Sequence, residues 1–178
     1  MIRLAVKSDA RALAAIYRPI VEKTAVSFAA KPPTPAEMAK QVAELTPRLP
    51  WLVFEEDGAV LGYAYAGPHR AREAYRWCVE TSVYVAPKAQ GKGVGRALYQ
   101  ALLNTLRAQG YVNAYAGIVL PNKASIALHE AVGFRRFCVY EGIGYKLGKW
   151  HDVGWWRLRL RKTRRPTEPV PLKKLLAR

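Results

Sequence analysis

Apolar side chains recur along the chain at two spacings, one typical of strands and one of helices. Residues 2–6 predict a first strand, and a helix capped at Ser8 follows it. The helix places its apolar residues on one face: Leu13, Ile16, Tyr17, Ile20 and Val21. Thr34 to Glu37 form a capping box with proline at the first helical position, so a second helix is expected to begin there.

The middle of the chain changes to strand-like patterns. Two apolar runs, 51–55 and 60–66, flank Asp57-Gly58, which is a strong signal for a β-hairpin. A further strand is predicted over about 77–85. It leads through a proline into a glycine-spaced turn and then into a helix that ends at Gly110, where a left-handed cap is expected.

The remaining elements alternate. We predict a strand over about 113–119, a helix beginning near Asn122, and final strands over about 134–141 and 153–160. This order predicts an α/β fold with one central mixed β-sheet flanked by helices on both faces. It also predicts one domain over 1–160 and a basic, proline-containing C-terminal tail over 161–178.

The glycine turn is the strongest chemical signal. Gly91, Gly93 and Gly95 carry no Cβ atoms, so the first amides of the helix can meet a phosphate oxygen directly. The spacing matches neither a P-loop, since no Ser or Thr follows Lys92, nor the glycine fingerprint of dinucleotide folds. A glycine turn with no ligand is the alternative.

A second signal lies in the next helix. Asn122, Ser125 and His129 fall on one helical face beside apolar residues, and an amide, a hydroxyl and an imidazole in a row suit a buried polar ligand. Equally open at this level is a capping Asn, a surface Ser and a His that is satisfied within the core.

Charge is the unusual bulk property. The 178 residues carry a formal net charge of +16. Nine Lys or Arg and one acid lie from Arg157 onward, so the tail is an arm for nucleic acid or a membrane surface, or a solvated extension. We favour the extension, since no aromatic residue follows Trp156 to stack on bases. Segment 161–171 is expected to run over the surface or be disordered, because its prolines oppose a helix.

Other classes are disfavoured by what the sequence lacks. It holds no apolar run long enough to span a bilayer and no apolar signal core at its start, which predicts a cytoplasmic protein. Cys78 and Cys138 have no metal-site spacing, so buried free thiols and no metal are expected.

The two signals together resemble the GNAT N-acetyltransferases. Gln90 to Gly95 is similar to the loop that holds the pyrophosphate of acetyl-CoA in that superfamily, and Asn122 to Phe134 is similar to its second acetyl-CoA motif. Lys149-Trp-His-Asp-Val-Gly-Trp155, with Arg72-Glu-Ala-Tyr75, resembles the phosphinothricin and methionine sulfoximine N-acetyltransferase branch. The resemblance implies a GNAT fold, acetyl-CoA as co-substrate and acetyl transfer to a small amino acid.

The resemblance also implies roles for residues. Glu80 matches the general base and His129 stands where many relatives have the tyrosine that serves the departing thiolate. The positions that match the cofactor site are Val83, Tyr84, Val85, Gln90, Gly91, Lys92, Gly93, Val94, Gly95, Arg96, Asn122 and Ser125. Those that match the substrate site are Phe28, Arg70, Arg72 and Tyr75.

Homodimers are common in the family. Trp150, Trp155 and Trp156 are therefore candidate interface residues, with core packing as the alternative. Two other functions stay open: a protein N-terminal or lysine acetyltransferase that docks through its basic tail, and a nucleic-acid binder without enzymatic activity. Nucleic acid is the less expected partner, because the carboxylate at position 80 and His129 would then have no role.

Overall fold

The computed structural model describes residues 1–177. Its centre is a seven-stranded sheet in the order β1-β2-β3-β4-β5-β7-β6. Among the strands of residues 1–177, only β4 and β5 are parallel neighbours, so the sheet is mixed as predicted. The strands are β1 (Ile2–Leu4), β2 (Trp51–Glu56), β3 (Ala59–Pro68), β4 (Cys78–Val85), β5 (Asn113–Val119), β6 (Arg135–Lys146) and β7 (Lys149–Arg159).

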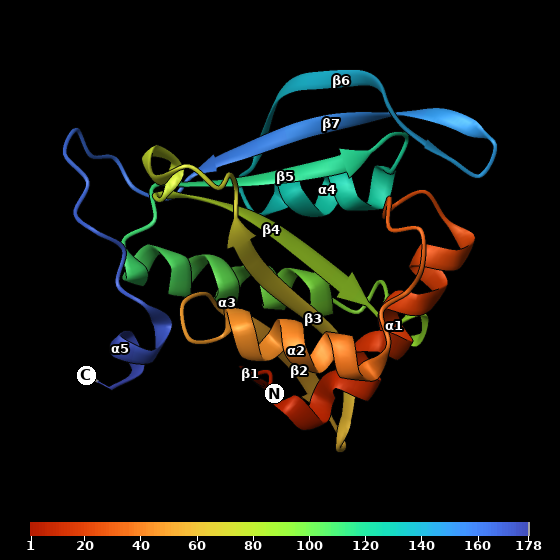
Figure 1. Ribbon diagram of the computed structural model, residues 1–178, viewed down its shortest axis with the longest axis horizontal. Coiled ribbons are helices and arrows are strands. Elements are labelled where there is room, and N and C mark those ends of the chain that lie inside the picture. The colour runs from red at the N-terminus through yellow and green to blue at the C-terminus, as the bar shows by residue number, and fades with distance from the viewer. Residues whose placement is uncertain (178) are drawn as a thin grey trace.

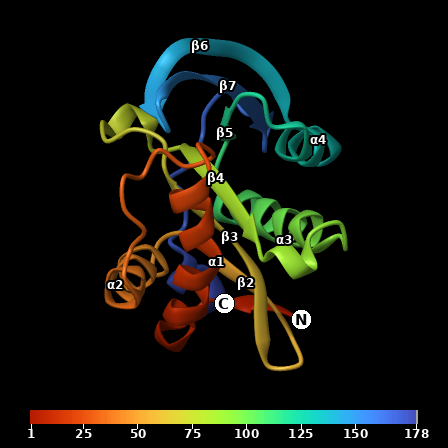
Figure 2. The ribbon, with the colours of Figure 1, turned by 90° about the vertical axis from the view of Figure 1, so that its right-hand side faces the viewer.

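Helices cover both faces of this sheet (Figures 1 and 2). They are α1 (Ala10–Lys23), α2 (Pro35–Leu45), α3 (Val94–Gln109), α4 (Lys123–Ala131) and α5 (Leu172–Leu176). Helices α1 and α2 enclose one core, with Leu13, Met38 and Trp51 among its buried residues. Helix α3 encloses the other, around Leu98 and Leu102, and α4 packs its Ile126 and Leu128 against the same core. Among residues 1–177, no helix combines the length and apolarity that a membrane span requires.

Most of the local signals up to the end of α3 are confirmed. The side chains of Thr34 and Glu37 cap the start of α2 reciprocally, with Glu37 N donating to Thr34 Oγ1 at 3.2 Å and Thr34 N donating to Glu37 Oε2 at 2.7 Å. Asp57 and Gly58 both take positive φ in the β2–β3 turn, and Gly110 ends α3 with a φ of 96°.

The predicted cap at Ser8 is wrong. Residues Lys7–Asp9 form a short 3-10 turn, and Asp9 is the residue that precedes α1. The Asp9 carboxylate accepts hydrogen bonds from the Val6 amide and from Arg3, so it holds the start of the helix to β1. The first strand accordingly ends at Leu4 and not at residue 6.

The last two strands are longer than predicted. They form one hairpin from Arg135 to Arg159, which turns at Leu147 and Gly148, both of which have positive φ. The prediction stopped early because Gly142 and Gly144 interrupt the apolar pattern and many of the outer residues are exposed.

The tail follows its predicted path only in part. Segment 161–171 runs over the surface without a helix, as expected, but it returns to the domain. Trp77 Nε1 donates to Thr167 O at 2.9 Å, Val170 N donates to Gln109 O at 2.7 Å, and Leu172 at the start of α5 is 1% exposed. These contacts anchor the tail to the domain. They were not predicted, because a proline-rich composition gives no sign of a buried contact.

Candidate active site

The site is built around a separation of two parallel strands. β4 and β5 pair at three positions, the last of which joins Glu80 to Tyr115, although both strands continue beyond it. At this point Thr81 Oγ1 donates to Tyr115 O at 3.2 Å and bridges the strands. Beyond it, a small cavity of about 60 Å³ lies between them and is lined by residues that include Val83, Gly117 and His129.

Backbone amides of β4 point into this gap. In the antiparallel ladder with β3, Ala86 N donates to Leu61 O, so the even-numbered residues of β4 bond to β3. The amides of Val83 and Val85 therefore face the side that β5 has left. This orientation agrees with the thioester-holding role that the sequence predicts for them, whereas the side chain of Tyr84 packs against Tyr17, at a ring distance of 4.8 Å.

The glycine turn opens at the end of β4. Gly91 and Gly93 have φ of 75° and 80°, a conformation that L side chains rarely adopt. Throughout the described chain, the amides from Gly91 to Arg96 donate no hydrogen bond, and a Cβ placed on Gly91 or Gly93 would meet nothing within 4 Å. Six free donors at a helix N-terminus fit a diphosphate.

The other residues of the turn have separate tasks. The Gln90 side chain donates to Val85 O at 3.2 Å and ties the turn to the strand. Lys92 and Arg96 are exposed, while Val94 is buried under the helix. Gly95 packs closely against α4, because a Cβ there would lie 3.1 Å from a methyl group of Leu128.

The predicted polar face of α4 is present and continues into α3. Asn122 Oδ1 accepts from Ser125 N at 3.1 Å, and His129 Nδ1 lies 2.7 Å from Ser125 O. A carbonyl only accepts, so Nδ1 carries the proton and Nε2 accepts from the Tyr99 hydroxyl at 2.7 Å. Burial lowers the pKa of His129 and raises that of Tyr99.

Tyr99 is therefore a site residue that sequence reasoning missed. It is fully buried on α3, and it lines the cavity between β4 and β5 together with His129. The sequence could have indicated it, because Tyr99 follows Leu98 on a helix that faces the core, and a buried phenol requires a polar partner.

Glu80 stands on the opposite face of β4 from this core. Its side chain is 40% exposed, and its Oε2 lies 3.5 Å from His69 Nδ1. Arg76, which could have neutralised it as a surface ion pair, instead contacts Glu168 at 2.6 Å and Glu73 at 3.7 Å. The Glu80 carboxylate is therefore available at the point where β4 and β5 begin to separate.

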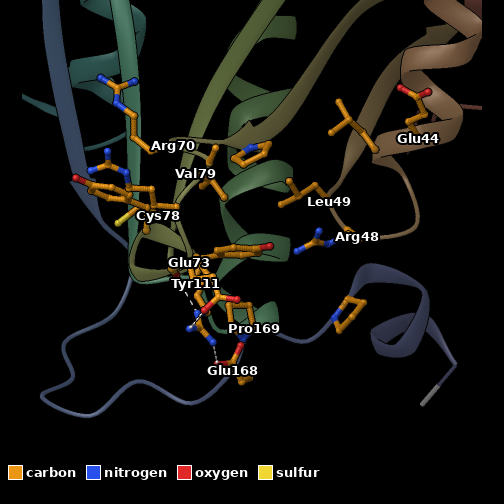
Figure 3. A pocket seen from close by; sticks show the side chains of 17 residues that line it. Glu44, Arg48, Leu49, Arg70, Glu73, Cys78, Val79, Tyr111, Glu168 and Pro169 are labelled. Carbon is orange, nitrogen blue, oxygen red and sulfur yellow. Dashed lines mark hydrogen bonds and ion pairs between the residues drawn. The ribbon is translucent and has the colours of Figure 1, made fainter.

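The predicted substrate residues separate into two places. Arg70, Arg72 and Tyr75 line a cavity of about 540 Å³ between the 68–76 loop, α2 and the tail. Figure 3 shows Arg70 at one end of this cavity and Glu168 at the other. Neither Glu80 nor His129 lines it. Phe28 lies elsewhere, against Gly144 and His151 of the β6–β7 hairpin.

Cysteine chemistry finds no support at this site. Both cysteines are free and half-buried, less enclosed than expected, and burial raises the pKa of Cys78 so that its reactive thiolate is disfavoured. Within residues 1–177, no group of three His, Cys, Asp or Glu side chains gathers as a metal site would.

Comparisons with known proteins agree with this geometry. Residues 2–155 match the family model described as an acetyltransferase (GNAT) domain. The phosphinothricin N-acetyltransferase of Streptomyces viridochromogenes is 43% identical over 95% of this chain and 93% of its own. The L-methionine sulfoximine/L-methionine sulfone acetyltransferase of Salmonella typhimurium is 39% identical over 89% of this chain and 94% of its own.

A solved structure extends the likeness to the fold. The phosphinothricin acetyltransferase of Sinorhizobium meliloti, in complex with acetyl-CoA, superposes with a TM-score of 0.91 at 38% identity, covering 97% of this chain and 96% of that one. A strand gap that exposes backbone amides, a cradle of free N–H groups and these matches lead to one conclusion: the chain belongs to the GNAT acetyltransferase family.

Proposed function

We propose that this acetyl-CoA-dependent N-acetyltransferase acetylates the amino group of a small amino acid of the phosphinothricin, methionine sulfoximine or methionine sulfone type. The names of its relatives support the substrate class. The observation that carries the proposal is the position of Glu80 at the last pair before β4 and β5 separate, on the strand whose Val83 and Val85 amides face the gap.

The free backbone amides described above indicate which residues would hold each part of acetyl-CoA. The free amides of the 91–96 turn would hold the diphosphate, and those of Val83 and Val85 would hold the pantetheine arm and polarise the thioester carbonyl. Bound acetyl-CoA supplies the activated acetyl group. Asn122 and Ser125 support this site by fixing the start of α4 and the tautomer of His129.

Glu80 prepares the acceptor. An α-amine is mostly protonated near pH 7 and attacks only after losing a proton, so a carboxylate within reach accelerates the reaction by about 10²–10⁴-fold. The family resemblance implies that Arg70, Arg72 and Tyr75 supply cations and a phenol for the α-carboxylate of the substrate. They line the cavity of about 540 Å³ and not the one beside His129, so this assignment rests on the resemblance and on the contact of the neighbouring His69 with Glu80. No covalent enzyme intermediate is needed, because the amine attacks the acetyl carbon directly.

His129 fits an orienting role better than that of a free acid. Its one proton is donated to Ser125 O, and a second proton at Nε2 would charge a side chain that is 4% exposed. Instead, Nε2 holds the Tyr99 hydroxyl in place beside the cavity. We therefore assign the pair Tyr99–His129 to the departing thiolate: the Tyr99 hydroxyl, whose one proton His129 Nε2 accepts in this structure, would turn that proton toward the sulfur as the thiolate leaves.

Turnover with and without the base tests the proposal. Thiol release from acetyl-CoA is measured with phosphinothricin, methionine sulfoximine and methionine sulfone. We expect Glu80→Gln to lower turnover by about 10²-fold or more while calorimetry shows unchanged acetyl-CoA binding. Glu56→Gln, an exposed carboxylate at the end of β2, is the control. Undiminished turnover in Glu80→Gln would remove Glu80 from the mechanism.

The same assay separates the protein-directed alternative. Because the tail is anchored through Leu172, removing it would damage the fold, so charge is the better variable. Neutralising the exposed Arg164, Arg165, Lys173 and Lys174 should leave amino-acid turnover unchanged. Activity on proteins that depends on these charges would favour the alternative. For the location we retain the cytoplasm, where acetyl-CoA is available.

The enzyme is proposed to act as a homodimer. Among the three predicted interface tryptophans, Trp156 is a core residue at 1% exposure and Trp155 is half-buried, whereas Trp150 is 66% exposed. Other exposed apolar residues lie along the same edge hairpin: Phe137, Tyr140, Ile143, Tyr145 and Leu147. A second copy would cover this surface. Light scattering should give twice the chain mass, and Trp150→Glu should give a monomer.

A further inference from the structure

His69 is held against the candidate base. It follows β3 at Pro68, and its ring stacks on Tyr115 of β5 with a centroid distance of 4.4 Å and an interplanar angle of 16°. The edge of Trp155 on β7 closes the other side at 5.8 Å and 78°. Two aromatic rings from different strands thus fix the orientation of the imidazole, and its side chain is only 15% exposed.

The fixed ring presents one nitrogen to Glu80. Nδ1 is buried and has no hydrogen-bond partner within residues 1–177, yet it lies 3.5 Å from Glu80 Oε2. A buried polar atom without a partner costs free energy, and a shift of a few tenths of an ångström would make this contact a hydrogen bond. Nε2 also has no partner among the described residues, but it is not buried, so it is the nitrogen that reaches solvent.

We propose that His69 is a positioning residue that orients the Glu80 carboxylate toward the acceptor amine. The inference rests on the proposed role of Glu80. In this arrangement neutral His69 donates its Nδ1 proton to Oε2, which leaves Oε1 to accept the proton of the substrate ammonium. His69 keeps its own proton throughout, and the amine lone pair that is freed forms the new bond to the acetyl carbon.

Charge at His69 would change this arrangement. Burial lowers the pKa of His69, Arg70 lowers it further, and Glu80 opposes both. From the packed strands it faces Tyr115 and Trp155, and Arg157 lies beside Tyr115. At neutral pH the ring is therefore uncharged. At lower pH the imidazolium would pair with Glu80 and weaken it as a base, so turnover should fall as pH decreases through the lowered pKa of His69.

Two substitutions distinguish the packing of the His69 ring from its function as a hydrogen-bond donor. His69→Phe keeps an aromatic ring between Tyr115 and Trp155 but removes the donor. His69→Asn places an amide nitrogen near the position of Nδ1 and cannot titrate. We expect His69→Phe to lower kcat by about tenfold or more with unchanged acetyl-CoA affinity, as for the loss of a hydrogen bond to a charged group. His69→Asn should restore most of this loss and remove the inflection from the acid limb of the pH profile.

A double-mutant cycle decides whether His69 acts through Glu80. In the Glu80→Gln background, His69→Phe should cause no further loss. An equal loss in both backgrounds would mean that His69 has only a structural role and would overturn the inference while leaving Glu80 as the base. Full turnover in His69→Phe would overturn it as well. Undiminished turnover in Glu80→Gln alone would reject the proposed base, and with it the role of His69. Thermal unfolding of each variant identifies losses that come from misfolding.

Discussion

Some positions in the core favour glycine, because any larger side chain would clash with a packed neighbour. Gly154 on β7 lies under the ring of Trp156, where a Cβ would come 2.5 Å from a ring carbon. Trp156 is 1% exposed and its Nε1 donates to Glu130 Oε1 at 3.1 Å, so a shift of the ring would disturb buried contacts and this hydrogen bond. We expect Gly154→Ala to lower the free energy of unfolding by about 1–3 kcal/mol, as overpacked cores do, in urea titrations.

Gly67→Ala on β3 is the matched control. A Cβ there would meet nothing within 4 Å, and its φ lies outside the left-handed region. Its effect should be near zero. An equal loss in both variants would mean that backbone freedom, and not the Trp156 ring, explains the requirement for glycine.

At the same scale, local signals could be predicted and distant contacts could not. The Thr34–Glu37 cap and the left-handed cap at Gly110 depend on neighbours within a few residues, so the sequence was sufficient. The contacts of Tyr99 with His129 and of His69 with Glu80 join residues from different elements. Nothing in the local pattern indicates which polar partner the fold will bring to a buried side chain.

Helix α5 shows how an element can depend on one residue. Its five residues include Leu172, which is 1% exposed, and Leu176, which is 63% exposed. The chain before it is fixed by Gln109, whose side chain donates to Arg48 O and Val170 O at 2.7 and 2.9 Å. The strand and helix order was predictable from periodicity, but this anchor was not, because a helix of five residues is too short for its three leucines to establish a period.

The two leucines provide the test. Leu172→Ala should lower the free energy of unfolding by about 2–4 kcal/mol, through lost burial and the cavity left behind. Leu176→Ala, on the same helix, should change it by less than about 0.5 kcal/mol. Limited proteolysis should cut 161–171 faster in the first variant only. Equal stabilities would show that the tail contributes no core contact in solution.

Across the whole molecule, charge as well as apolar packing connects the helices to the sheet. Arg3 on β1 contacts both Asp9, before α1, and Glu55 on β2, and so connects the N-terminal segment to the sheet edge. The Arg3 guanidinium and the Val6 amide lower the pKa of Asp9 against a smaller cost of burial. The Asp9 side chain is 7% exposed, so solvent screens this pair weakly.

The lowered pKa of Asp9 determines how the free energy of unfolding changes as pH falls. The folded pKa of Asp9 lies below its unfolded value near 4, so its contribution is complete above that value and is lost as pH falls through the folded pKa. Asp9→Asn should therefore be less stable than the wild type at pH 7 by about 2 kcal/mol, and the difference should shrink steadily below about pH 4. Glu22→Gln, which removes an exposed partner of Arg18 on α1, should show almost no difference at either pH. A gap between Asp9→Asn and wild type that persists undiminished in acid would mean that Asp9 acts through its shape and neutral hydrogen bonds, and that the Arg3 ion pair does not hold the first helix to the sheet.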